Sequence, residues 1–381
     1  MASGQVIAKR AKTAAMGEDD RHKTAKLHST DEAEALIDAG KAKKRYRVTS
    51  FDVAAEAGVS QSTVSRALAG DPVVSEATRA RVAAAAAKLN YHVDENAARL
   101  RTGRTGTLAV VVICRPDEDI KNFNPFHFAL LGSVCAAASR RRHETIVSFQ
   151  GASDHLWGLY QEQRKADGLI VIGTSENWDA WDYFHSIAAE GAHLVCWGSP
   201  HEDLDWVRSD NIGGARMATQ HLIDSGYRNI VCIASETSAQ RQFKERYEGY
   251  AELLREQGME PRLITFEEGM SRDEQGRRAA VELIRSGVPF DAIFACCDEM
   301  ALGALRVLRE QGISVPEQVG LIGFDGIRAG AHSAPPLSSV EPDFQTAGEV
   351  LVDRLLSVIA GTPGEKKRVP VRLLPRGSSR R

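Results

Sequence analysis

The fold of the N-terminal part is decided by one stretch, residues 50–69, which reads SFDVAAEAGVSQSTVSRALA. Apolar residues recur at helical spacing on both sides of Gly58, a residue that accepts the left-handed backbone at the end of a helix. The pattern predicts one helix over residues 51–57 and a second over residues 61–68. Two short helices joined by a glycine turn are typical of a helix-turn-helix.

The side chains of this stretch suit that geometry. Thr49 or Ser50 can cap the first helix, and Ser60 can cap the second. We expect the helices to cross at Ala54, because a larger side chain there would keep them apart. The residues expected to pack inward, around Val59, are Val53, Ala57, Val64 and Ala67.

A third helix and an outward polar face complete this unit. The third helix is predicted from the cap Ser75 to about Leu89, with an inward face of Val82, Ala86 and Leu89. The polar residues that fall on the outer face of the second helix are Gln61, Ser62, Ser65 and Arg66. Such a helix can enter the major groove of DNA. The alternative is a solvated polar face on a small helical bundle.

Charge is distributed unevenly along the chain, whose net charge is −3. Residues 1–106 carry 18 Lys+Arg and 13 Asp+Glu, a balance of +5, whereas residues 107–381 carry 30 and 38, a balance of −8. A basic segment on an acidic body favours a polyanion as the partner of the N-terminal part. Solvated tails show the same excess, so charge alone leaves both interpretations open.

The composition excludes several classes of protein. With 43% hydrophobic and 26% charged residues, the chain is typical of globular proteins with two or three domains. Its longest uncharged apolar run, residues 108–114, is far shorter than the roughly 20 residues of a membrane span. The first thirty residues contain no apolar segment of a secretory signal, so we expect a cytoplasmic protein without a membrane partner. Its six cysteines form no C-x-x-C pair, which favours reduced, buried thiols.

From Thr107 onward, apolar runs alternate with amphipathic stretches such as 239–257 and 298–311. The predicted strands are 107–113, 145–149, 168–172, 193–197, 229–234, 262–265, 291–295 and 318–323. Repeated βαβ units predict parallel sheets covered by helices on both faces. The length favours two similar lobes with a ligand crevice at the carboxyl ends of the strands.

No motif in the sequence indicates catalysis, a cofactor or a metal. The chain lacks G-x-G-x-x-G, the phosphate loop G-x-x-x-x-G-K-[ST] and H-E-x-x-H, and its eleven histidines show no metal-ligand spacing. His127 and His221 are interpreted as polar surface or satisfied helix positions. We therefore expect a binding module, with no enzyme activity, no catalytic residues, no cofactor and no metal.

The stretch from Val48 to Arg66 resembles the start of the lac repressor/galactose repressor family of bacterial transcription regulators. Further motifs of that family follow in order: VSEATRARV at 74–82, LNY at 89–91, AARL at 97–100, NPF at 124–126, DN at 210–211, GA at 214–215, HL at 221–222, RYEGY at 246–250, ALG at 301–303 and GFD at 323–325. The resemblance covers about residues 47–377. It implies a helix-turn-helix headpiece of three helices and a two-lobed α/β effector domain like the periplasmic binding proteins.

The resemblance also implies DNA contacts. Gln61, Ser62 and Arg66 would face base edges, while Ser60, Thr63 and Ser65 would contact phosphates. Thr49, Asn90 and Tyr91 would lie near the backbone, and Ala97 belongs to the segment similar to the hinge helix. Residues 95–101 would become helical only on specific DNA, with Leu100 wedged into the minor groove. An ordinary linker residue is the alternative for Leu100. Val93 and Asp94 stand where the family usually has Pro-Asn, and Asp94 can still cap the hinge helix.

For the effector, the resemblance places Arg246 and Asp325 in the crevice, where a donor fork and a carboxylate can hold the hydroxyls of a sugar-like ligand. A structural ion pair is the alternative. Phe126 and Trp197 would stack on the ligand, or would simply belong to the core. Two positions depart from the family pattern: Cys297 replaces a polar Asn, and 198–199 is Gly-Ser instead of Asp-Arg. Fewer polar partners therefore remain than in a typical sugar pocket.

These observations predict four segments and one function. The segments are a disordered extension (1–45), a DNA-binding headpiece (46–92), a hinge helix and linker (93–106) and an effector-binding and dimerisation domain (107–381). The predicted function is that of a homodimeric regulator, expected to be a repressor, which binds a pseudo-palindromic operator in double-stranded DNA and responds to a small sugar or sugar derivative. The rival hypothesis is a ligand-binding protein or sugar-acting enzyme whose helical head contacts proteins.

Overall fold

The computed structural model describes residues 48–92, 103–116, 123–235, 240–266, 269–362 and 365–380. The chain divides between Asp94 and Glu95 into two compact units, here named the headpiece and the body. The predicted extension (1–45) and residues 93–102 of the predicted hinge and linker lie outside the described residues.

The described part of the headpiece consists of helices α2 (Ser50–Ala57), α3 (Gln61–Leu68) and α4 (Glu76–Lys88), as predicted. Thr49, and not Ser50, caps α2: its backbone N–H and its hydroxyl each lie 2.7 Å from Oδ2 of Asp52. Gly58 ends α2 in the left-handed conformation, with φ 61°. Local capping chemistry therefore sets the helix boundaries, which is why the sequence could predict them.

The headpiece core is small and rich in alanine. All four residues predicted to face inward are buried, and so is Ala54, while Val59 packs against them partly buried. On the third helix the prediction is confirmed for Val82 and Ala86. Leu89 lies just beyond α4 and is only partly buried.

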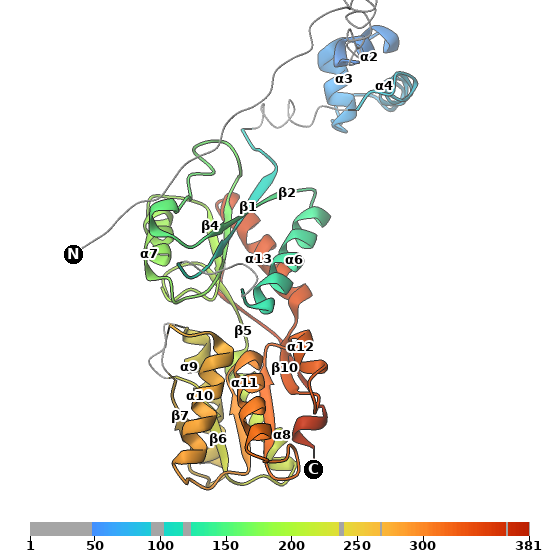
Figure 1. The fold of residues 1–381 in the computed structure, drawn as a ribbon. Coiled ribbons are helices and arrows are strands. Elements are labelled where there is room, and N and C mark those ends of the chain that lie inside the picture. The colour runs from blue at the N-terminus through green and yellow to red at the C-terminus, as the bar shows by residue number, and fades with distance from the viewer. Residues whose placement is uncertain are drawn as a thin grey trace, which may run out of the picture. The chain divides into compact units, whose positions relative to one another are not determined.

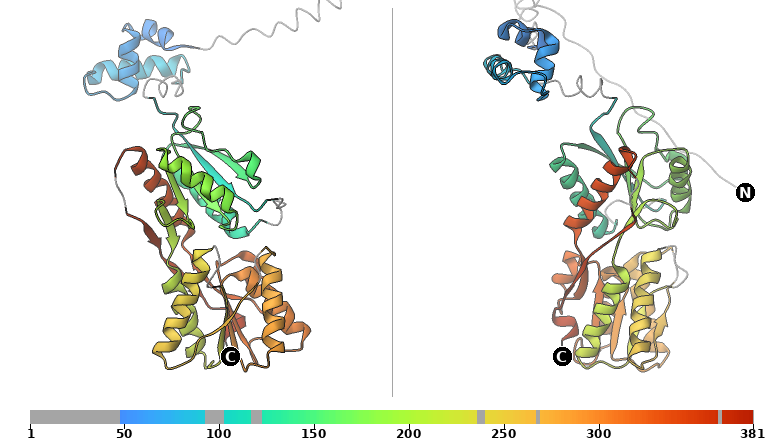
Figure 2. Two further views of the ribbon diagram at one scale, coloured as in Figure 1. Left: turned by 90° about the vertical axis from the view of Figure 1, so that its left-hand side faces the viewer. Right: turned by 180° about the vertical axis from the view of Figure 1, so that it is seen from behind.

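The body has two lobes, each with one six-stranded sheet among the described residues (Figures 1 and 2). Lobe 1 contains β1 (Thr107–Ile113), β2 (Glu144–Gln150), β3 (Leu169–Gly173), β4 (Leu194–Trp197), β5 (Trp206–Ser209) and β11 (Lys367–Val369). Lobe 2 contains β6 (Ile230–Ile233), β7 (Arg262–Ile264), β8 (Ala292–Ala295), β9 (Gly320–Phe324), β10 (Ser338–Pro342) and β12 (Val371–Leu374). The strand orders are β11-β5-β4-β3-β1-β2 and β12-β10-β9-β8-β6-β7. All pairings are parallel except β10 with β12.

Helices cover both faces of each sheet (Figure 2). Lobe 1 has α6 (Pro125–Arg140), α7 (Trp178–Ala189), α13 (Phe344–Ile359) and the short η2 (Ser153–His155). Lobe 2 has α8 (Asn211–Asp224), α9 (Arg241–Glu256), α10 (Arg272–Arg285), α11 (Asp298–Glu310), α12 (Arg328–Ala331) and η3 (Gly377–Ser379). In β1, alternate residues enter the core under α6 and α13 or the core under α7. A strand buried on both faces is apolar throughout, as the sequence indicated.

The described chain passes between the lobes at three places: from β5 to α8, from β10 to α13, and from β11 to β12 through Pro370. Strands β5, β10, β11 and β12 were not among the predicted strands. They are short, and β5 pairs with β11, which lies far along the chain, at Val207 and Lys367. Such strands are set by tertiary pairing and carry little local signal.

The described residues also bear on the state of the cysteines and on membrane-spanning helices. All six cysteines are free, and five of them are buried. Among the described helices, none is long and apolar enough to cross a membrane.

Candidate DNA interface and ligand pocket

Helix α3 presents the predicted polar face. Ser62 and Arg66 are exposed, while Gln61, Thr63 and Ser65 are half-buried. The opposite face carries Val64 and Ala67, which are buried in the headpiece core. The core therefore fixes the rotation of α3, and the outward side chains are available to a partner.

The first turn of α3 is held by a polar cluster. Ser60 caps the helix, because its hydroxyl accepts a hydrogen bond from the N–H of Thr63 at 3.2 Å. The same hydroxyl lies 2.8 Å from the hydroxyls of Ser62 and Thr63. Gln61 Nε2 donates to the hydroxyl of Ser50 on α2 at 3.2 Å. Hydroxyl groups at a helix N-terminus suit a phosphate, because the helix dipole favours negative charge there.

The other residues predicted to contact DNA differ in their exposure and in their contacts. Thr49 is occupied as the cap of α2. Asn90 is exposed and follows α4 in the left-handed conformation, with φ 50°. Tyr91 packs partly buried against the headpiece core. Ala97 and Leu100 lie outside the described residues, so the hinge helix stays a prediction.

The body contains a cavity of about 750 Å³ between its lobes, within the ordinary range of ligand pockets. All four predicted effector residues line it: Phe126, Trp197, Arg246 and Asp325. The sequence had placed the crevice at the carboxyl ends of the strands, and Trp197 and Asp325 lie at the ends of β4 and β9.

Arg246 and Asp325 form a buried ion pair, with 3.1 Å between Nη1 and Oδ1. The guanidinium also donates from Nε to Oδ1 of Asn211 at 3.0 Å and from Nη1 to the carbonyl of Cys296 at 2.6 Å. It lies 3.7 Å from the centre of the Phe324 ring. Burial raises the pKa of Asp325 to about 6, although Arg246 opposes the rise. The pair is therefore a buried ion pair that also lines the cavity, and its role in binding an effector stays a prediction.

The turn that carries Asp325 is held by Asp298. Oδ1 of Asp298 accepts from the hydroxyl of Ser339 at 2.7 Å, and Oδ2 accepts from the N–H of Ile327 at 2.8 Å. The backbone of Asp325 is strained: its φ is 114°, a value that residues other than glycine rarely adopt. The two hydrogen bonds of Asp298 anchor the turn in this conformation. Burial raises the pKa of Asp298 well above its ordinary value.

The apolar side of the cavity is formed by lobe 1. The rings of Phe126 and Trp197 have centroids 5.9 Å apart, and both are also part of the lobe 1 core. Asn124 places Phe126, because its side-chain oxygen caps α6 by accepting from the N–H of Phe126 at 2.8 Å. Core packing and exposure to the cavity therefore coexist at these two residues.

Several charged cavity residues escaped sequence reasoning. Glu176 joins the lobes: its carboxylate lies 2.9 Å from Arg115 of lobe 1 and 2.6 Å from Arg272 of lobe 2. Both arginines line the cavity, as does Glu299, whose pKa burial raises to about 7. Arg115 follows β1 at its carboxyl end, so its position beside a predicted strand end was the available signal.

The interpretation of His127 as a surface or satisfied helix position was wrong. His127 lines the cavity, and its Nδ1 is buried without a hydrogen-bond partner. Burial, with the charge of Arg272, lowers its pKa to about 4, so the ring is neutral at pH 7. His221 does occupy a satisfied helix position, with Nε2 2.7 Å from the hydroxyl of Ser379. Cys297 also lines the cavity, and burial raises the pKa of its thiol.

A chain of polar contacts connects the ion pair to the strands that join the lobes. Asn211 accepts from Arg246 and donates from Nδ2 to Oε2 of Glu245 at 2.8 Å. Glu245 receives two hydrogen bonds of 2.9 Å from Arg368 on β11 and lies 3.6 Å from Arg208 on β5. Direct contacts therefore connect Asp325, through Arg246, Asn211 and Glu245, to both strands.

The chain combines a helix-turn-helix unit with a two-lobed body that contains a polar cavity. This combination is that of a DNA-binding regulator that responds to a ligand. Family models match on both units: bacterial regulatory proteins of the lacI family over residues 51–94, and the periplasmic binding protein-like domain over residues 219–379. The chain is 34% identical over 339 residues to the HTH-type transcriptional regulator CelR of Thermobifida fusca, covering 87% of this chain and 96% of CelR. The chain therefore belongs to the lacI family of bacterial regulatory proteins, as the sequence motifs implied.

Solved structures agree with this fold. A CelR–cellobiose complex is 31% identical with a TM-score of 0.62, covering 87% of this chain and 100% of CelR. The lac repressor dimer bound to operator and the anti-inducer ONPF has a TM-score of 0.67 at 24% identity, covering 88% of this chain and 99% of the repressor chain. The predicted fold, a helix-turn-helix headpiece with a two-lobed α/β body, is confirmed.

Proposed function

We propose that the protein is a homodimeric transcription regulator, acting as a repressor, that binds a pseudo-palindromic operator and responds to a neutral sugar bound between its lobes. The observation that carries this proposal is the combination, in one lacI-family chain, of an outward polar face on α3 with a polar cavity in the body. The proposed segments are the headpiece (46–92), the hinge helix and linker (93–106) and the effector and dimerisation domain (107–381).

The headpiece residues have distinct proposed roles on DNA. Gln61, Ser62 and Arg66 read base edges from the exposed face of α3. Ser60, Thr63 and Ser65 contact phosphates, which suits the hydroxyl cluster at the helix N-terminus. The remaining proposed contacts are Thr49, Asn90, Tyr91, Ala97 and Leu100.

The cavity favours an uncharged, hydroxyl-rich ligand over a polyanion. Its three guanidinium groups, from Arg115, Arg246 and Arg272, are each paired with a carboxylate: Arg246 with Asp325, and Arg115 and Arg272 with Glu176. The aromatic side of lobe 1 can stack on the apolar face of a sugar ring, and the polar side of lobe 2 can bind its hydroxyls. CelR, a relative, has been solved with cellobiose, so a disaccharide is the first candidate.

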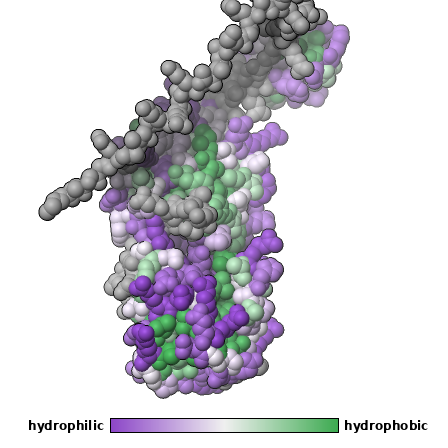
Figure 3. Space-filling model, in the orientation of Figure 1, coloured by the Kyte–Doolittle hydropathy of each residue, from purple (hydrophilic) through white to green (hydrophobic). Residues whose placement is uncertain are grey.

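Exposed apolar residues on lobe 1 support the proposed dimer. Phe128 of α6 and Ile146, Val147 and Phe149 of the edge strand β2 are each between 37% and 42% exposed. The rings of Phe128 and Phe149 lie 6.1 Å apart. Figure 3 shows apolar surface on lobe 1 in the region of β1 and β2. A second copy of the chain covering this edge would also supply the second headpiece that a two-fold symmetric operator needs.

The proposal includes a cytoplasmic location and the absence of enzyme activity. The proposed partner, operator DNA, lies in the bacterial cytoplasm. The relatives are named as transcriptional regulators, and the sequence contains none of the catalytic motifs considered above. In this scheme, sugar binding changes how the lobes close and thereby favours or disfavours paired hinge helices on DNA.

A salt titration of DNA binding tests the regulator hypothesis. We expect the full-length protein to bind DNA containing its pseudo-palindromic operator at least about 10³ times more tightly than random DNA, with affinity falling steeply as salt rises. Equal affinity for both sequences would support the rival hypothesis, a ligand-binding protein or sugar-acting enzyme whose head contacts proteins.

A thermal-shift screen tests the ligand hypothesis. Cellobiose, other disaccharides and monosaccharides are compared with sugar acids, sugar phosphates and nucleosides, because a ligand that binds the folded state raises the melting temperature. The sugar that raises it most is then tested for its effect on operator affinity. A response to sugar phosphates alone would contradict the neutral ligand.

A further inference from the structure

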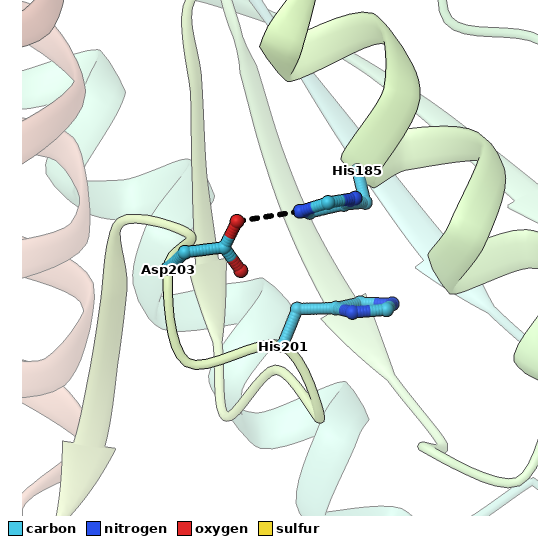
Figure 4. Close-up of side chains that lie close together, drawn as sticks. All are labelled: His185, His201 and Asp203. Carbon is cyan, nitrogen blue, oxygen red and sulfur yellow. Dashed lines mark hydrogen bonds and ion pairs between the residues drawn. The ribbon is translucent and has the colours of Figure 1, made fainter.

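Lobe 1 carries a cluster of histidine and aspartate side chains that does not line the cavity. His185 comes from α7, whereas His201 and Asp203 come from the loop between β4 and β5 (Figure 4). One nitrogen or oxygen from each of these three residues lies within 4.8 Å of the others. Asp182, one turn before His185 on α7, lies 3.1 Å from Nε2 of His201.

The contacts give each member of the cluster a defined position. Nε2 of His185 lies 2.6 Å from Oδ2 of Asp203. The two imidazole rings are stacked, with centroids 4.5 Å apart and an interplanar angle of 19°. The loop is fixed on its other side by Glu202, which lies 2.6 Å from Arg208 and 3.0 Å from Arg241. These donors are therefore presented by a helix and a restrained loop.

We propose that His185, His201 and Asp203 bind a divalent transition-metal ion of the zinc class, with Asp182 orienting His201. Two imidazoles and one carboxylate are a ligand set typical of Zn²⁺. Mg²⁺ and Ca²⁺ need six or more oxygen ligands, which this cluster does not offer among the described residues. Three protein ligands leave a further coordination position for water.

The position of Asp182 supports this assignment. A histidine that binds a metal through one ring nitrogen usually donates its other N–H to a carboxylate, which fixes the tautomer and the ring orientation. Nε2 of His201 lies 3.1 Å from Oδ1 of Asp182 but makes no hydrogen bond in this conformation, so a rotation of the ring is needed for Nε2–H to donate to Asp182 and leave Nδ1 for the ion. Zinc–nitrogen bonds of about 2.0–2.1 Å place tetrahedral ligand atoms roughly 3.3 Å apart. The three ligand atoms here lie within 4.8 Å of one another and the two rings are stacked, so binding requires the side chains to rotate until their ligand atoms point to one centre.

The alternative is a set of metal-free ion pairs between protonated histidines and aspartates. It differs from the proposal in one measurable respect. Ion pairs bind no zinc, whereas a three-ligand site binds one equivalent and ties α7 to the loop. The bound ion should raise the melting temperature of the protein, since it binds only the folded arrangement.

The experiment is a zinc titration of the full-length protein, free of any histidine tag, in competition with a chromophoric chelator. We expect one Zn²⁺ equivalent whose affinity falls at least tenfold in H185Q and in D203N. The matched control is H332Q, which removes an exposed histidine of lobe 2 and should leave the affinity unchanged. Co²⁺ in place of Zn²⁺ should give the visible absorption of a nitrogen- and oxygen-ligated site in the wild type and not in H185Q.

The variant D182N tests the role of Asp182 in orienting His201. D182N retains all three ligands and should lower zinc affinity by about 10- to 100-fold, as expected for a residue that orients a ligand. Melting curves without metal show whether each variant is folded. The proposal is overturned if the wild type binds no zinc, or if the wild type, H185Q and D203N bind it equally, since the ion is then held elsewhere in the chain. A melting temperature raised equally by Mg²⁺ would also contradict it.

Discussion

The headpiece and the body differ in how deeply the residues proposed to contact their partners are buried. In the headpiece, the proposed contacts lie largely on one exposed helix, α3, whose buried side is small and apolar. In the body, the cavity is lined from many separate segments, and its central charged residues are buried. A surface site can change its side chains at little cost in folding free energy. A buried ionic site cannot, because each charged group there stabilises another.

The largest effect is expected for R246A. The substitution leaves Asp325 buried without its ion-pair partner, so we predict a loss of about 3–5 kcal/mol in unfolding free energy, together with loss of the effector response. Denaturant unfolding and operator binding with and without sugar measure these effects. The control is R255A, an exposed position at the end of the same helix, which should change stability by less than about 0.5 kcal/mol. Unchanged stability and a full response in R246A would show that the ligand binds elsewhere.

Glu299 should make the unfolding free energy of the protein depend on pH. Because burial raises the pKa of Glu299 to about 7, the folded state holds a proton that the unfolded state releases at lower pH. The contribution of Glu299 to wild-type stability therefore falls as pH rises from about 5 to 8, and E299Q lacks this contribution. Relative to the wild type, the unfolding free energy of E299Q should increase by up to roughly 3 kcal/mol over that pH range. Urea unfolding at several pH values measures it, with E310Q, exposed on the same helix, as control. A difference that is constant with pH would contradict the prediction.

R66A should affect DNA binding without affecting folding. Removing an exposed guanidinium from α3 should cost about 1–3 kcal/mol in operator binding, concentrated at one base pair of each half-site. The melting temperature should not change. R81A, an exposed arginine of α4, is the comparison and should weaken binding slightly on every sequence. Binding to a set of operator variants distinguishes the two. Loss of headpiece stability in R66A would break the contrast between the two regions.

The smallest effect is expected for F126L. The substitution keeps most of the apolar volume in lobe 1 but removes the aromatic face toward the cavity. We predict a loss of about 0.5–1.5 kcal/mol in sugar affinity, with operator binding of the sugar-free protein unchanged. Calorimetric titration with the sugar chosen by the screen measures it. An affinity equal to that of the wild type would assign Phe126 to core packing alone.

The accuracy of prediction from sequence differed between regions for a physical reason. Helix boundaries in the headpiece follow from neighbours in the chain, such as the cap Ser60 and the turn residue Gly58. Strand β1 could be predicted because both of its faces are buried. The ion pair of Arg246 and Asp325 was placed through family resemblance, and their burial was not predicted. The bridge from Glu176 to Arg115 and Arg272 had no local pattern at all.

The sequence by itself determined the helix-turn-helix, the βαβ order of the body and the family, because these depend on periodicity, capping and short motifs. Only the tertiary structure decided which polar residues share a cavity, which strands join the lobes, and that His185 meets His201 and Asp203. Those contacts join residues far apart in the chain. Their energies depend on burial and on distances of a few ångströms, which no local pattern of residues encodes.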